Sequence, residues 1–159
     1  LKAMQIYFLR HADAFPKGPK YREDNLRPLT SDGKKQAKQI ARFLQGIHIE
    51  AILTSPLVRA EQTAQILSDR LGAKIKAVEE LSPGFNLSKL PKVVEGYKKA
   101  ERIILVGHEP DLSDTVKKMI GGKAELEIGK GGLAVVEVEP ERSLASGKLI
   151  LLVQPEFLA

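Results

Sequence analysis

The chain has 159 residues, with 25 lysines and arginines against 20 aspartates and glutamates, which gives a formal net charge of +5. It contains no cysteine, and this excludes a disulfide-stapled secreted domain, thiol catalysis and cysteine-ligated zinc or iron–sulfur centres. The hydrophobic fraction of 43% is too high for a disordered chain, and the length suits one domain. The basic balance alone leaves nucleic acid, a membrane surface and a small anionic substrate open as partners.

The N-terminal segment has neither targeting nor membrane character. The apolar run 6–9 is too short for the core of a signal peptide, and no apolar run approaches the ~20 residues of a membrane helix. We interpret Met4 as the natural start and residues 1–3 as an extension. We therefore expect a soluble, cytoplasmic protein that forms a single domain over residues 1–159.

Strand-like and helix-like segments alternate along the first 120 residues. Short β-rich runs predict strands at residues 5–9, 51–53, 75–78 and 102–106. Helical periodicity with capping residues predicts helices from Thr30 or Ser31 to near Gly46, and over residues 57–71, 88–99 and 110–120. Alternation of this kind is typical of a parallel sheet with helices on both faces.

The last forty residues change character. Residues 133–139 and 148–153 read as strands, and residues 140–147 as the turn between them, which predicts an antiparallel hairpin at the edge of the sheet. The fold class is therefore α/β: a three-layer α/β/α sandwich whose mostly parallel sheet has an antiparallel edge. Residues 12–28 show no periodicity and directly follow the first strand, a position at which open α/β sheets bind ligands.

Two of the three histidines stand where predicted parallel strands end. Arg10 and His11 close the first strand, and His108 closes the strand at residues 102–106. Arg59 lies about one turn into the helix that follows Ser55, so it can face the same edge. Because guanidinium groups bind phosphate oxygens bidentately, these residues predict a pocket for a compact dianion.

A histidine nucleophile fits this set. Imidazole attacks phosphorus only when the attacking nitrogen is unprotonated, and nearby arginines disfavour the imidazolium form of His11. We expect the arginines and a protonated His108 to offset the charge on the transferring phosphoryl oxygens, without a metal or another cofactor.

Four motifs in order then give a resemblance. They are Leu9-Arg10-His11-Ala12-Asp13-Ala14, Arg27-Pro28-Leu29-Thr30, the run from Thr54 to Ala64, and Val106-Gly107-His108-Glu109-Pro110. Together they resemble the histidine phosphatase superfamily, with its phosphoglycerate-mutase-like fold, and within it the SixA-type phosphohistidine phosphatases.

The resemblance implies a phosphatase with a covalent phosphohistidine on His11. Arg10, Arg59 and His108 would line the phosphate pocket, and Arg27 would be a more peripheral anion contact. The family's proton donor is a carboxylate, for which Glu80 is the candidate here, although it is equally interpretable as surface charge. The implied substrate is phosphohistidine, presented by another protein, or another phosphoramidate or phosphomonoester.

Two other functions stay open. His11, Asp13, His108, Glu109 and Asp111 supply enough ligands for a metal-dependent phosphoesterase, although the adjacent arginines would repel the cation. A non-catalytic phosphate- or phosphopeptide-binding module would keep the same pocket. The lysines are dispersed without interleaved aromatic residues, so we expect neither nucleic acid nor a membrane as partner. The oligomeric state stays open.

Overall fold

A computed structural model describes residues 2–158, so Leu1 of the expected N-terminal extension lies outside the described residues. Six strands form one sheet in the order β3-β2-β4-β1-β5-β6. The strands are β1 (Met4–Arg10), β2 (Ala51–Thr54), β3 (Ile75–Ala77), β4 (Arg102–Gly107), β5 (Leu133–Glu139) and β6 (Ser143–Val153). The first four pair in parallel, and β5 runs antiparallel to both β1 and β6.

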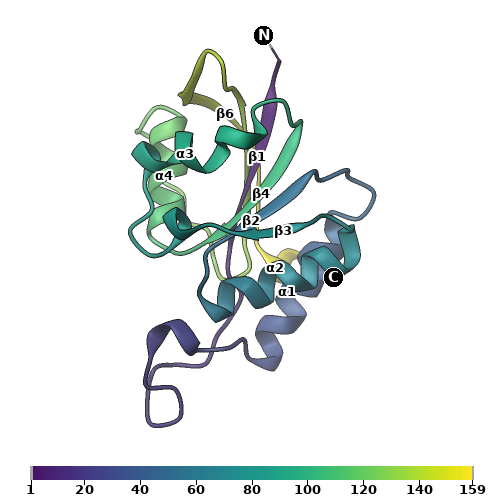
Figure 1. Cartoon of the computed structure of the whole chain (residues 1–159), viewed down its shortest axis with the longest axis vertical. Coiled ribbons are helices and arrows are strands. Elements are labelled where there is room, and N and C mark those ends of the chain that lie inside the picture. Colours follow the sequence, from purple (N-terminus) through teal and green to yellow (C-terminus); the bar gives the residue numbers. More distant parts are fainter. Residues whose placement is uncertain (1, 159) are drawn as a thin grey trace.

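Helices cover both faces of this sheet (Figure 1). Helices α1 (Ser31–Phe43) and α2 (Val58–Leu71) lie on one face, while α3 (Leu90–Val94) and α4 (Asp111–Met119) lie on the other. Successive residues of β1 therefore enter two cores, with Phe8 in one and Leu9 in the other, both fully buried. The predicted three-layer α/β/α fold with an antiparallel edge is confirmed.

Local sequence signals set the ends of the two helices nearest the site. The hydroxyl of Thr30 accepts a hydrogen bond from the Gly33 N–H at 3.0 Å, which caps the first turn of α1. Helix α2 ends at Gly72, which has a left-handed φ of 76° that glycine adopts without a steric penalty.

Two expected elements differ in the structure. The helix expected over residues 88–99 is a short α3 flanked by 3₁₀ turns at Leu87–Lys89 and Glu95–Tyr97, because Pro91 lacks an N–H donor and Gly96 is a poor helix former. The turn expected over residues 140–147 was also wrong, since β6 already begins at Ser143, which pairs with Glu139. Two register shifts along the β5–β6 pair let this longer hairpin form.

The segment 12–28 extends beyond the carboxyl end of β1 (Figure 1). It contains one 3₁₀ turn, Asp24–Leu26, and closes at its base through a bridge between Ala14 and Leu29. None of residues 15–28 is buried. Within residues 2–158 no helix has the length and apolar character needed to cross a membrane.

Candidate active site

The pairing of β1 with β4 brings the two histidines together. Arg10 lies opposite Gly107 in the parallel register, and the His11 N–H continues the ladder by donating to the Gly107 carbonyl at 3.0 Å. The rings of His11 and His108 consequently lie with their centroids 5.2 Å apart and their planes inclined by 55°. Both side chains emerge at the carboxyl edge of the sheet.

A cavity of about 380 Å³ opens at this edge. Its lining residues are Arg10, His11, Ala14, Asp24, Arg27, Arg59, Pro83, His108, Glu109 and Lys130. Five of the six residues expected at the site from the sequence therefore line one cavity, and Glu80 does not.

Helix α2 holds the backbone after His11 in place. The buried Ala12 N–H donates to the hydroxyl of Thr63 at 3.1 Å, and this hydroxyl donates in turn to the Arg59 carbonyl at 2.8 Å. From α1, the side-chain oxygen of Gln36 accepts from the Asp13 N–H at 2.9 Å. The nucleophile candidate thus stands on backbone that is hydrogen-bonded to two helices.

The contacts of His11 define its protonation. Nδ1 lies 2.8 Å from the Ala12 carbonyl, which accepts only, so Nδ1 carries the proton and Nε2 keeps its lone pair. The Nε–H of Arg59 donates to this Nε2 at 3.2 Å. Burial, and after it the charges of Arg59, Arg10 and Arg27, lower the pKa of His11 to about 4 against the opposing effect of the Ala12 hydrogen bond. His11 is therefore neutral at pH 7, with burial as the main cause rather than the arginines alone.

His108 is also neutral in this structure. Burial, followed by the neighbouring His11 and Arg59, lowers the pKa of His108 to about 3, so its imidazole is neutral at pH 7 in this structure. The protonated form expected during phosphoryl transfer stays a prediction. Its Nε2 lies 2.8 Å from the hydroxyl of Ser55, which already accepts from the Leu57 N–H. The Ser55 hydroxyl can therefore donate a hydrogen bond to Nε2, and neutral His108 then carries its proton on Nδ1.

The arginines enter the cavity from different elements. Arg59 on α2 is only 4% exposed. Its Nη1 donates to the Asp24 carbonyl at 2.8 Å and its Nη2 to the Asp24 carboxylate at 3.2 Å. Arg27 pairs with the same carboxylate at 3.0 Å, and Arg10 donates to the Ile128 carbonyl at 3.2 Å.

Two buried nitrogens at the site have no hydrogen-bond partner within residues 2–158. They are Nε of Arg10 and Nδ1 of His108. A buried N–H without an acceptor costs about 1–3 kcal/mol. Arg10 and His108 both line the cavity, so this cost lies at the candidate site, and the binding of a compact dianion there stays a prediction.

Glu80 lies away from this cavity. Its carboxylate pairs with Lys92 at 2.9 Å, and the hydrogen bond from Lys92 lowers the pKa of Glu80. A proton donor needs the opposite shift and a place beside the leaving group. The surface-charge interpretation of Glu80 is the one that fits its position.

The carboxylates of the alternative metal site are engaged elsewhere. Asp13 accepts from Lys130 at 2.8 Å and from the Thr30 hydroxyl at 2.7 Å, while Glu109 accepts from the N–H and hydroxyl of Ser113. No group of three or more histidine, aspartate or glutamate side chains within residues 2–158 is arranged to hold a metal ion. Metal independence itself stays a prediction.

From the sequence, no role at the site was assigned to Ser55, Lys130 or Asp24. Ser55 bonds His108, Lys130 enters because β5 pairs with β1, and Asp24 binds two of the arginines. Ser55 lies inside a recognised motif, and Asp24 stands three residues before Arg27, but Lys130 gave no signal beyond its flanking glycines.

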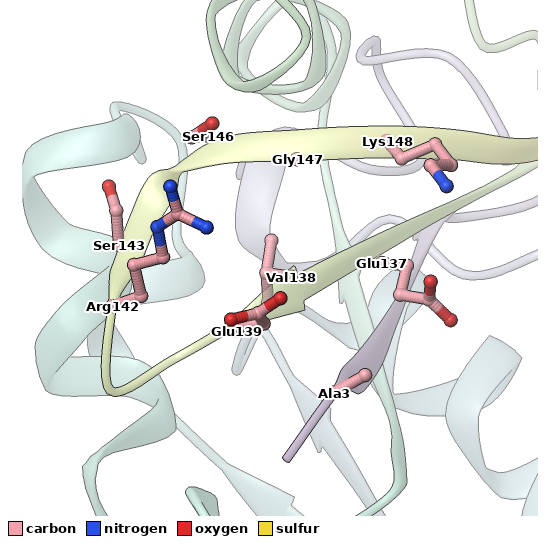
Figure 2. A pocket seen from close by; sticks show the side chains of 9 residues that line it. All are labelled: Ala3, Glu137, Val138, Glu139, Arg142, Ser143, Ser146, Gly147 and Lys148. Atoms are coloured by element: carbon pink, nitrogen blue, oxygen red, sulfur yellow. The ribbon is translucent and has the colours of Figure 1, made fainter. Parts of the chain in front are cut away.

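A second hollow of about 310 Å³ lies at the opposite end of the sheet, where β1 begins (Figure 2). It is formed by the tip of the β5–β6 hairpin and Ala3, and the side chains of Glu139 and Arg142 lie at the hairpin end. None of the residues expected at the site reaches it. The histidine cavity is therefore the candidate active site.

Known proteins are similar to this chain in sequence and in fold. The sequence model of the Histidine phosphatase superfamily (branch 1) matches residues 6–83. The chain is 36% identical to an uncharacterised protein of Picosynechococcus sp., over 98% of this chain and 99% of that protein. It is 25% identical to phosphohistidine phosphatase SixA of Escherichia coli strain K12, over 86% of each. The structure of the protein histidine phosphatase SixA complexed with tungstate shares the fold, with a TM-score of 0.84, 24% identity, and coverage of 97% of this chain and 99% of that one.

Proposed function

Because the chain belongs to the histidine phosphatase superfamily, we propose that it is a phosphatase that acts through a covalent phosphohistidine on His11, with phosphohistidine on another protein as substrate. The observation that carries the proposal is the state of His11. Its Nδ1 proton is held by the Ala12 carbonyl, and its unprotonated Nε2 lies beside a buried arginine in a cavity of about 380 Å³. A neutral imidazole in that position is a nucleophile for phosphorus.

The first step transfers the phosphoryl group to His11. Nε2 attacks phosphorus, a new P–N bond forms, and the bond between phosphorus and the substrate's ring nitrogen breaks. Arg10, Arg59 and Arg27 donate to the phosphoryl oxygens, and the Ala12 carbonyl stabilises the Nδ1–H of the phosphorylated ring. Phosphate also supplies negative charge beside His108, which raises the pKa of this histidine toward the donor form.

The second step returns His11 to its starting state. Water attacks phosphorus, the P–Nε2 bond breaks, and its electron pair returns to Nε2. The attacking water loses a proton to solvent, and inorganic phosphate leaves. No metal or cofactor takes part in either step.

A phosphohistidine substrate agrees with the absence of Glu80 from the cavity. A substrate imidazole already protonated at its second nitrogen leaves as neutral imidazole, whereas an alkoxide leaving group needs a proton donor. The cavity also lies at an exposed edge, because no residue of the 15–28 segment beside it is buried. A phosphorylated side chain on a protein surface can reach such a site. SixA, one of the relatives, bears the name phosphohistidine phosphatase.

The test compares the unchanged chain with His11→Ala and His48→Ala. His48 is the exposed third histidine and lies outside the cavity, so it is the matched control. Substrates are a phosphohistidine protein, a sugar phosphate and an aryl phosphate, each with EDTA and no added metal. We expect turnover and acid-labile phosphate on the unchanged chain and on His48→Ala, fastest with phosphohistidine. His11→Ala should keep its circular dichroism and lose both signals.

Three results would contradict the proposal. Turnover by His11→Ala at the rate of the unchanged chain would rule out His11 as the nucleophile. Activity that EDTA abolishes and a divalent metal restores would favour the metal-dependent phosphoesterase. Phosphate binding without turnover or labelling of His11 would favour a non-catalytic binding module.

A further inference from the structure

Asp24 lies in the candidate cavity and binds two of the arginines expected to hold phosphate. Both Nη groups of Arg59 donate to this one residue, at 2.8 Å to its carbonyl and 3.2 Å to its carboxylate. The second carboxylate oxygen accepts from Arg27 at 3.0 Å. A carboxylate shared by two guanidinium groups takes the donors that phosphate oxygens would need.

The nucleophile is covered in the same arrangement. The third donor of Arg59, its Nε–H, lies on the Nε2 lone pair of His11 at 3.2 Å. Attack on phosphorus requires that lone pair. The hydrogen bond between Arg59 and His11 must therefore break before the first step. A phosphate bound to the Nη groups in place of Asp24 would favour a position of Arg59 in which this bond is broken.

We propose that Asp24 is a carboxylate plug that competes with phosphate for Arg59 and Arg27 and thereby sets the affinity of the pocket for phosphate. The inference rests on the proposed function, because it assumes that this pocket binds phosphate. Substrate displaces the plug, and the plug returns to the arginines when inorganic phosphate leaves.

The segment that carries Asp24 can move with few other losses. Within the described residues, the only hydrogen bonds between residues 16–26 and elements outside the 12–28 segment are those that Asp24 accepts from Arg59. The side chain of Asp24 is 48% exposed, whereas that of Arg59 is 5% exposed. Because Arg59 is buried and Asp24 is at the surface, the carboxylate is the partner that leaves the pocket, and Arg59 needs only the small shift that frees His11 Nε2.

The charge of Asp24 suits a plug rather than a proton donor. Burial works to raise the pKa of Asp24, but Arg59 and Arg27 outweigh it and hold the pKa below its ordinary value. An ionised carboxylate at neutral pH is an anion surrogate with no proton to give.

The experiment measures binding of inorganic phosphate by calorimetry to the unchanged chain, Asp24→Asn, Asp24→Ala and Glu23→Gln. Glu23→Gln is the matched control, since this neighbouring exposed carboxylate makes no side-chain hydrogen bond or ion pair within residues 2–158. We expect both Asp24 variants to bind phosphate about tenfold more tightly, the result for a plug that fills the pocket about nine-tenths of the time. Glu23→Gln should stay within about twofold of the unchanged chain, because a screened surface charge alone contributes little. KM for the phosphorylated substrate should fall with the phosphate dissociation constant.

Each other outcome is decisive. Equal or weaker phosphate binding by both Asp24 variants would overturn the plug and leave the proposed function standing. A large loss of kcat without tighter phosphate binding would make Asp24 a proton donor and also overturn the plug. Equal tightening by Glu23→Gln would reduce the effect to net charge. Phosphate binding by none of the four proteins would overturn the anion pocket, and with it both the plug and the proposed function.

Discussion

The hydroxyl of Thr63 offers a direct test of how α2 supports the nucleophile. It accepts the Ala12 N–H and donates to the Arg59 carbonyl, and both Thr63 and Ala12 are fully buried. Thr63→Val keeps the shape of the side chain and removes both bonds. The Ala12 N–H is then buried without an acceptor, which costs about 1–3 kcal/mol, whereas the Arg59 carbonyl stays within the helix ladder and loses less.

This loss sets the size of the effect. For a chain of 159 residues, an unfolding entropy of about 2.1 cal/mol/K per residue makes 2 kcal/mol equal to a fall in Tm of roughly 6 °C. Activity should fall as well, because Ala12 also orients the His11 ring through its carbonyl. A small displacement of a nucleophile reduces kcat/KM by about tenfold to a hundredfold.

Thr115→Val is the matched control. The Thr115 hydroxyl is also buried, but it has no hydrogen-bond partner within residues 2–158. The same change there removes an unpaired polar group, so Tm should stay level or rise and kcat/KM should not change. Thermal unfolding followed by circular dichroism and steady-state kinetics on both variants give the answer. Equal losses of Tm in the two variants, or no loss in Thr63→Val, would refute the reasoning.

The remaining predictions concern the backbone beside His11 and the protonation of the ring. A Cβ on Gly33 would lie 2.0 Å from the Asp13 carbonyl oxygen, so Gly33→Ala should lower the free energy of unfolding by about 1–3 kcal/mol and reduce kcat/KM. Gly96 has open space at the position of its Cβ, so Gly96→Ala should change neither quantity in the same unfolding and kinetic assays. The pKa of His11 is lowered to about 4, so kcat/KM, corrected for the titration of the substrate, should stay level from pH 7 to about pH 5 and fall as the pH drops through about 4; a fall centred near pH 6.5 would contradict this protonation state. Because the unfolded histidine takes up its proton near pH 6.5, the stability contributed by neutral His11 is present above that pH and is lost as the pH falls toward 4.

The sequence predicted the parts of the site that depend on strand order. Arg10 ends β1, and His11 and His108 directly follow β1 and β4, whose apolar runs are recognisable in the sequence. Parallel neighbouring strands bring their carboxyl ends to one edge of the sheet whatever the side chains. Arg59 was predictable for a related reason, since three residues separate the end of β2 from the start of helix α2 and Arg59 lies in the first turn of that helix. These residues are placed by regular elements with a period that can be read from the chain.

Residues on irregular segments could not be placed in this way. Lys130 reaches Asp13 only because β5 runs antiparallel beside β1, a pairing that puts residues 117 positions apart in contact. The prediction that Glu80 lies at the site fails for the converse reason, since Glu80 does not line the cavity. It lies in the right part of the sequence for a proton donor, but a 3₁₀ turn at Glu79–Leu81 directs its carboxylate to Lys92.

The protonation of His108 shows why a list of site residues is not yet a mechanism. The sequence predicts a protonated His108 during phosphoryl transfer, but burial of the imidazole beside His11 and Arg59 makes its charged form unfavourable in this structure. The burial that keeps the His108 imidazole neutral also strengthens the attraction between a protonated His108 and a bound dianion. His108 therefore acts as a responsive group rather than a permanent one, and the fixed positive charge of the pocket comes from the arginines, whose counter-ion in this structure is the carboxylate of Asp24.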